Sequence, residues 1–185
     1  MTSDKKENLI PPHGGYRNLK SYQNSEIVFD LTRIFCEKWI DKRDRTFDQM
    51  VQAARSGKQN IAEGSMASGT SKKTELKLIN VARASLEELL LDYEDFLRGK
   101  DIEKWGKDNP LSKEIRNMAY LTNRTHKTYL NYFEKPEIAA NVLICLIHQT
   151  NYLLDQLKRT LEKEFLESGG FTERLYNMRR ERRKY

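Results

Sequence analysis

Residues 136–168 read PEIAANVLICLIHQTNYLLDQLKRTLEKEFLES, and they give the strongest helix signal in the chain. Apolar residues recur there at helical spacing, in a stripe formed by Leu143, Ile147, Leu154, Leu157, Leu161 and Phe165. A neighbouring stripe contains Ile138, Val142, Leu146, Gln149 and Leu153. Pro136 suits the first helical position, and Gly169 and Gly170 follow the last. We predict one long helix over 136–168 with two apolar faces.

Other segments carry the same periodicity and are separated by glycine-containing or charged stretches. We expect a helix to end before Gly64, a C-terminal glycine, and the next helix to start at Ser71, a suitable N-cap. Between these two helices, SMASGTSKK reads as a loop. In chain order, the expected helices cover about 19–40, 46–63 and 71–98, with a shorter and more polar one over 112–134.

The composition favours helices throughout. Leucine occurs 21 times and valine only 4 times, and 97 consecutive residues between Pro12 and Pro110 contain no proline. We predict an all-α fold, an antiparallel up-down four-helix bundle with an extra shorter helix and a basic C-terminal tail. The expected domain organisation is a flexible leader (1–15), the bundle (16–168) and the tail (169–185). Within the bundle we separate a core (16–98), a connection with the extra helix (99–135) and the long last helix (136–168).

The long helices carry more apolar surface than one neighbour covers, and burial between subunits is one way to satisfy it. We therefore predict a homo-oligomer. The alternative is a monomer in which the extra helix, 112–134, covers the second stripe.

The charge of the chain is concentrated at its C-terminal end. The residues after Gly170 include six cations and two glutamates, which gives a net charge of 6 − 2 = +4, compared with +6 for the whole chain. Arginine pairs with phosphates, and Phe171, Tyr176 and Tyr185 are available to stack on bases, so nucleic acid is the expected ligand. The alternative is a solvated helix that only aids solubility. The expected phosphate contacts are Arg174, Arg179, Arg180, Arg182, Arg183 and Lys184.

The chain lacks the usual signatures of an enzyme. It contains no Glu-x-x-His, no P-loop and no GxSxG motif, and its three histidines are scattered. Glu88, Asp92 and Asp95 share a helix face that could hold Mg²⁺, although a salt-bridged surface explains them more simply. We therefore expect no catalysis, no cofactor and no metal. Without a long apolar run or an apolar leader, we also expect a cytoplasmic protein that does not enter membranes.

Two motifs resemble those of a known family. They are QMVQAARSGKQNIAEG at 49–64 and ASLEEL at 84–89, with YRNL at 16–19 upstream. They are similar to the four-helix-bundle family encoded in intervening sequences of bacterial 23S rRNA genes, over about 16–98. Residues 99–185 resemble a C-terminal suffix region of some members.

Within these motifs we expect mainly structural roles, and a direct binding role is the alternative. Asn60 and Glu63 can bond to the chain as it turns, and Gly64 permits a left-handed exit from the helix. The motif residues with expected structural roles are Gln49, Asn60, Glu63, Gly64, Ser85 and Glu88, of which Ser85 and Glu88 serve the facing helix.

The resemblance implies a cytosolic ring, typically a pentamer. Relatives of this kind are accessory proteins of diversity-generating retroelements, which bind a reverse transcriptase and nucleic acid. Where the family has a basic pair, this chain has Val51 and Gln52. We expect the positive surface to be supplied instead by Arg55, Lys58, Lys72 and Lys73.

The function that these features predict is a non-catalytic oligomeric adaptor that binds nucleic acid or a nucleoprotein partner, such as a reverse-transcriptase-like protein. The alternative is a structural or protein–protein interaction module, without nucleic-acid binding, that uses its surplus apolar helix face.

Overall fold

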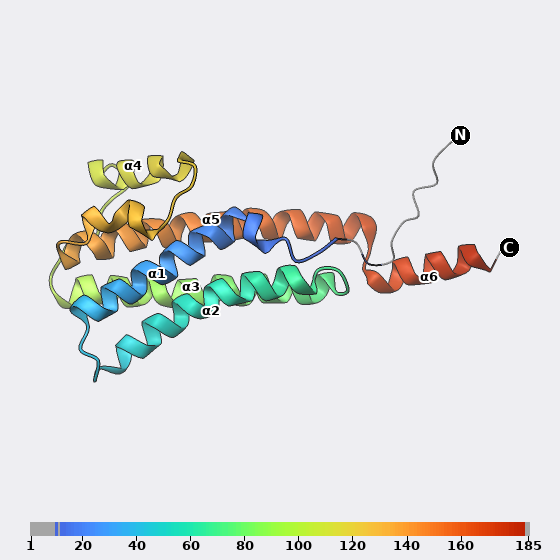
Figure 1. The fold of residues 1–185 in the computed structure, drawn as a ribbon, viewed down its shortest axis with the longest axis horizontal. Coiled ribbons are helices and arrows are strands. Elements are labelled where there is room, and N and C mark those ends of the chain that lie inside the picture. The colour runs from blue at the N-terminus through green and yellow to red at the C-terminus, as the bar shows by residue number, and fades with distance from the viewer. Residues whose placement is uncertain (1–9, 11, 184–185) are drawn as a thin grey trace.

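The computed structural model describes residue 10 and residues 12–183 (Figure 1). Every regular element in this part of the chain is helical, which confirms the all-α prediction. In chain order the elements are η1 (Tyr16–Asn18), α1 (Lys20–Trp39), α2 (Arg45–Ala67), α3 (Lys72–Gly99), α4 (Pro110–Asn117), η2 (Met118–Tyr120), η3 (His126–Tyr132), α5 (Pro136–Ser168) and α6 (Phe171–Arg182).

Four helices form the body of the molecule: α1, α2, α3 and α5. The helix α1 packs against α2 and α5, and α3 packs against the same two helices, so the four contacts close a cycle. Successive members of this cycle run in opposite directions, and α4 and η3 pack on one half of α5 (Figure 1). The body therefore encloses one elongated apolar core.

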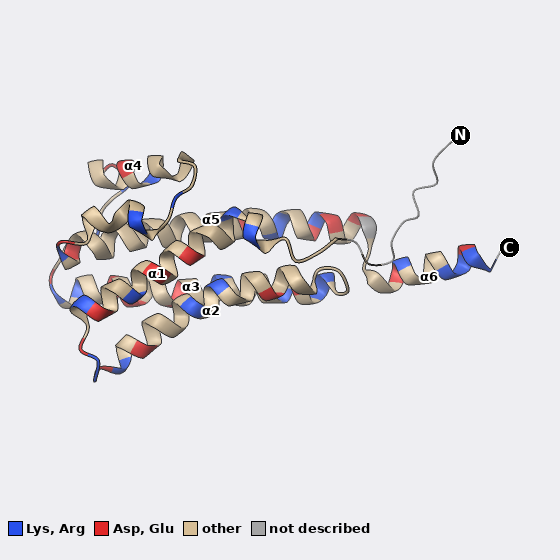
Figure 2. Ribbon diagram, viewed as in Figure 1, with Lys and Arg blue, Asp and Glu red and all other residues tan. Residues whose placement is uncertain are grey.

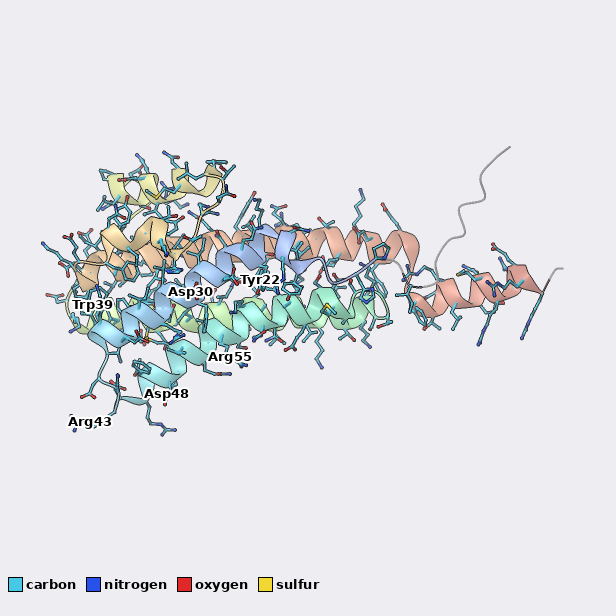
Figure 3. All side chains as sticks on the ribbon, in the orientation of Figure 1. Tyr22, Asp30, Trp39, Arg43, Asp48 and Arg55 are labelled. Atoms are coloured by element: carbon cyan, nitrogen blue, oxygen red, sulfur yellow. The ribbon has the colours of Figure 1, made fainter. Side chains whose placement is uncertain are left out.

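Aromatic rings fill one end of this core. The ring of Phe35 lies 5.0 Å from that of Tyr93 and 5.0 Å from that of Phe96, both in edge-to-face geometry. Trp39 adds a ring 5.1 Å from Phe35 at the end of α1 (Figure 3). Tyr93 is fully buried, and its hydroxyl donates to Oγ1 of Thr32, 3.1 Å away. These contacts join α1 to α3 through both packing and a hydrogen bond.

We predicted that the second helix ends before Gly64. This prediction was wrong, because α2 continues to Ala67. Gly64 lies where α2 approaches α3, and a Cβ there would be 3.4 Å from the carbonyl oxygen of Glu75 and 3.4 Å from Cβ of Leu78. Its backbone is helical and does not have the left-handed φ of a C-terminal glycine. The predicted loop at 65–73 shrinks to 68–71. Close helix contact, not helix termination, accounts for this glycine.

The predicted helix over 112–134 was also wrong. The chain forms α4, η2 and η3 instead, with a break at Asn123, whose φ is +58°. Asparagine is among the few residues that tolerate this conformation. Thr125 then starts η3, and its backbone N–H donates to Oγ1 of Thr128 (3.2 Å). Local side-chain hydrogen bonding thus competes with a continuous helix here.

This segment is attached to α1 by polar contacts. Arg124 donates to Oδ1 of Asn24 (2.7 Å) and to the hydroxyl of Tyr129 (2.9 Å). Nδ1 of His126 lies 3.2 Å from a carboxylate oxygen of Asp30 (Figure 3 labels Asp30). The guanidinium and the imidazole therefore hold the irregular segment against the body.

The other helix boundaries agree with the predictions within one residue at most ends, including 136–168. Most of the predicted leader, residues 1–9 and 11, lies outside the described residues. Its last part is attached to the body, because the backbone N–H of Gly14 donates to the carbonyl of Ser65 (3.1 Å). The predicted basic tail contains the helix α6.

Candidate nucleic-acid interface

The helix α6 stands apart from the body, beyond the end of α5 (Figure 1). Two glycines separate α6 from α5: Gly169 has φ +65°, and Gly170 has extended backbone. Gly169 donates its N–H to the carbonyl of Phe165 (3.1 Å), which closes α5. Gly170 donates to Oε2 of Glu173 (2.9 Å), which caps the start of α6. We name the unit formed by this joint and α6 the arm.

Helical periodicity sorts the side chains of α6 into two faces. Residues spaced three, four or seven positions apart share a face, and on one side they are basic or aromatic. This basic face comprises Tyr176, Arg179, Arg180 and Arg183. A second face, the apolar stripe, comprises Phe171, Leu175 and Met178. It lies about 120° around the helix from the basic face, and Arg179, four residues after Leu175, is at the border between the two. Arg174 borders the stripe, and Arg182 continues it by one turn.

The arginines of the basic face are available to a ligand. Arg179, Arg180 and Arg183 are exposed, and Figure 2 shows the concentration of cations at the end of α6. Within the described residues, none of the three guanidinium groups is paired with a carboxylate. Lys184, the sixth predicted cation, lies outside the described residues.

An exposed aromatic ring lies among these cations. Tyr176 is 64% exposed, and the guanidinium carbon of Arg180 is 6.0 Å from the centroid of its ring. Guanidinium groups bind phosphate oxygens in bidentate fashion, and an exposed ring stacks on an unpaired base. The basic face therefore combines the two contacts that a nucleic-acid strand offers.

The four predicted cations of the body are spread over α2 and the start of α3. Lys72 pairs with Glu75 (3.0 Å) and with Glu164 (3.4 Å). Nζ of Lys58 lies over the ring of Phe29, 4.3 Å from its centroid. Lys73 is exposed at the start of α3, and Arg55 is exposed in the middle of α2, far from α6 (Figure 3). These four residues do not form one phosphate-binding surface.

Of the six motif residues with predicted structural roles, Gly64 is described above, and the other five divide into two groups. Gln49, Glu63 and Glu88 are exposed on α2 and α3. Ser85 and Asn60 lie at the contact between these helices. Oγ of Ser85 is 2.8 Å from Oγ of Ser56, and Nδ2 of Asn60 donates to the carbonyl (2.9 Å) and to Oγ (3.2 Å) of Ser56.

Sequence reasoning missed Ser56, which is the centre of this hydrogen-bond chain. Its position four residues before Asn60 was the available signal, because an amide at that spacing reaches the preceding turn. Sequence reasoning also expected Asn60 to bond to a turning chain, whereas it bonds within α2. The motif therefore positions α3 against α2.

Asp92 has an unusual environment in α3. Its Oδ2 is buried and has no hydrogen-bond partner among the described residues, although the residue as a whole is partly exposed. Loss of hydration, followed by the nearby charges of Glu88 and Asp95, raises the pKa of Asp92 to about 6. Asp95 pairs with Arg98 of the same helix (2.8 Å) rather than with a neighbouring helix.

Replacing Asp92 with asparagine is expected to stabilise the protein at pH 7. The folded-state pKa of about 6 lies above the ordinary value of 3.8, so the folded state binds the proton more tightly. The stability of the wild type therefore falls as pH rises from 3.8 to about 6. Above pH 6 the folded protein holds an ionised and poorly hydrated carboxylate, and this loss of stability remains at pH 7. Allowing for solvent screening of a partly exposed carboxylate, we expect a gain of about 1 kcal/mol.

Urea unfolding at pH 7 and at pH 4 measures this effect. The two proteins should converge at the lower pH, where the wild-type carboxyl is mostly protonated. Glu37→Gln is the matched control and should give no gain at pH 7, because Glu37 is exposed and paired with Arg33 of the same helix (3.5 Å). An Asp92→Asn protein less stable than wild type at pH 7 would contradict the argument.

Neither cysteine has a reactive environment. Burial raises the pKa of Cys36 to about 12, and burial also raises the pKa of Cys145, whose Sγ lies 3.6 Å from Oγ of Ser112. Loss of hydration lowers the pKa of His148. In the described part of the chain, no group of three or more His, Cys, Asp or Glu side chains is arranged to hold a metal ion.

Comparison with protein-family models, with curated proteins and with solved structures finds no match for this chain. Among the helices that the structure describes, none combines the length and the apolar character needed to cross a membrane.

Proposed function

We propose that this protein is a non-catalytic, oligomeric, cytoplasmic adaptor that binds nucleic acid, alone or within a nucleoprotein partner, through the basic face of α6. The observation that carries the proposal is the arm itself. The helix α6 and its C-cap residue Arg183 hold five arginines and two glutamates, a net charge of 5 − 2 = +3, and α6 projects beyond the body. A projecting cationic helix approaches a polyanion without interference from the nearly neutral remainder of the chain.

In this proposal the body is an antiparallel four-helix bundle of the 23S rRNA intervening-sequence type, and α4 with η2 and η3 is an addition to it. Two features support this assignment. The four body helices contact one another in a closed cycle, and the resembling motifs meet at the contact between α2 and α3 through Ser56, Asn60 and Ser85. The motif thus supplies the scaffold, and the arm supplies the binding surface.

Ending the chain after Gly170 tests the proposal. We expect the shortened protein to lose most of its affinity for nucleic acid, because the basic face is removed while the core residues remain. Fluorescence anisotropy with a labelled single-stranded RNA, and with a labelled DNA duplex, measures the affinity at low salt. Circular dichroism checks that the body stays helical. Equal affinity of the full and shortened chains would exclude the arm as the binding element.

A second candidate function is a protein–protein interaction module. Large apolar side chains point outward from two body helices: Val81 is 39% and Leu91 54% exposed on α3, and Tyr152 is 63% exposed on α5. Scattered exposed apolar residues are common, so this observation is weaker than the charge of the arm. The module is favoured if the full chain binds neither probe at about 50 mM salt.

A further inference from the structure

We propose that the apolar stripe of α6 docks on the end of α5 of a second copy of this chain. The inference rests on the oligomeric state in the proposed function and identifies the surfaces that form it. It gives the two faces of α6 separate roles: the stripe joins copies, and the basic face binds nucleic acid.

Within residues 12–183, the apolar stripe has no extensive partner. Phe171, Leu175 and Met178 are partly exposed, and in the described residues α6 has no extensive packing against another element. A helix of 12 residues is marginal in water by its own propensity and gains stability when an apolar face is covered. A second surface that covers the apolar stripe would therefore stabilise α6.

The end of α5 offers such a surface. Leu161 is buried, α5 continues beyond it to Ser168, and the side chains of residues 162–167 are exposed. Leu166 is 84% exposed and Phe165 is 36% exposed there. The seven residues after Leu161 extend over about 10 Å at 1.5 Å per residue, enough for two turns of another helix to pack on them.

The charges of the two surfaces are complementary. Residues 162–167 hold three glutamates and one lysine, a net charge of 1 − 3 = −2, whereas α6 is basic. The intrachain partners of Glu162 and Glu167 are lysines at 3.9 and 3.8 Å on the surface, and such exposed pairs contribute little. Both glutamates are therefore available to an arginine of another copy.

Arg174 supplies an independent observation. Its Nε is buried and has no hydrogen-bond partner among the described residues, and the side chain borders the apolar stripe. A buried donor without an acceptor is costly, so a carboxylate brought by a second copy would satisfy it. Arg174 and Arg182 thus belong to the docking face, whereas Arg179, Arg180 and Arg183 stay free for phosphate.

A second copy fits this surface better than the same chain does. Only Gly169 and Gly170 separate α5 from α6, Gly170 is extended, and α6 leads away from the body (Figure 1). Folding α6 back along its own α5 requires a reversal of the chain within these two residues. The helix α6 instead points away from its own body, where a second copy can reach it.

Sedimentation equilibrium of the full chain tests the inference. Wild type is expected to have at least twice the mass of one chain, 2 × 21.8 = 43.6 kDa. Leu175→Ser with Met178→Ser should weaken self-association about a hundredfold and give particles of 21.8 kDa on dilution. Tyr176→Ser, on the basic face, is the control and should keep the wild-type mass. A wild type of 21.8 kDa at all concentrations, or an unchanged mass of the stripe variant, would overturn the inference.

A charge-exchange pair tests the inference without removing apolar side chains. Arg174→Glu with Arg182→Glu, and separately Glu162→Arg with Glu167→Arg, should each weaken self-association, and mixing the two proteins should restore it. Absence of restoration would count against contact between copies. Anisotropy of the same samples separates the two proposals: a single-chain wild type that binds RNA or DNA refutes the docking alone, and an assembled wild type that binds neither refutes nucleic-acid binding alone.

Discussion

Replacing Arg179, Arg180 and Arg183 by glutamine is expected to weaken nucleic-acid binding about a hundredfold near 0.1 M salt. Each arginine that neutralises a phosphate releases a condensed counterion, and this release supplies most of the sequence-independent affinity. The three side chains are exposed and, among the described residues, unpaired, so their loss leaves no carboxylate without a partner. The apolar stripe is unchanged, so the variant should keep the native mass of wild type.

The matched control removes the same charge from the other end of the body. Lys42, Arg43 and Arg45 lie in and next to the turn between α1 and α2, and Figure 3 shows Arg43 far from α6. Replacing all three by glutamine should change the affinity by much less than the arm variant does. Anisotropy titrations of the two variants at one salt concentration make the comparison. Equal losses would show that the total charge matters and that the arm has no special role.

Replacing Tyr93 by alanine should destabilise the protein by about 3 to 5 kcal/mol. Tyr93 is fully buried between α1 and α3, so its removal deletes the ring contact with Phe35 and leaves a cavity. Small domains have a total stability of about 5 to 15 kcal/mol, so this loss brings the protein close to unfolding. Urea denaturation followed by circular dichroism measures it.

The control for this prediction is Tyr93→Phe. It keeps the ring and removes only the hydroxyl that donates to Thr32, so we expect a loss of about 1 kcal/mol. If Tyr93→Ala and Tyr93→Phe lost the same stability, the ring would not be a part of the core on which the fold depends.

Much of the fold was predictable because the long helices carry strong periodic patterns. The helix over 136–168 has two apolar stripes and clear end signals at Pro136 and Gly169, and its boundaries were predicted correctly. The apolar pattern over 112–134 is weaker. The left-handed backbone of Asn123 and the hydrogen bonds around Thr125 interrupt the helix there. Periodicity alone did not detect this local competition.

Gly64 shows why a residue type alone does not determine its role. A glycine near the end of a periodic segment is typical of a helix terminus, and we predicted one. The structure places it inside α2, facing Glu75 and Leu78 of α3. Only the tertiary contact distinguishes a terminating glycine from one that permits close approach, and a single sequence does not contain that contact.

The sequence predicted which residue types form the candidate site, but it did not predict how the helix arranges them on its faces. The cluster of arginines after Gly170 is visible in the sequence, whereas the division of α6 into a basic face and an apolar stripe depends on the start of the helix at Phe171. The predicted contributions of Lys58 and Lys72 could not be judged beforehand, because Phe29 and Glu164 reach them only through tertiary packing.

The salt dependence of binding tests the role of the arm most directly. The logarithm of the binding constant should fall linearly with the logarithm of salt concentration, and the slope for the full chain should exceed that of the Arg179, Arg180 and Arg183 variant by about 3, one for each lost phosphate contact. Parallel lines for the two proteins would contradict the account, because the three arginines would then contact no phosphate.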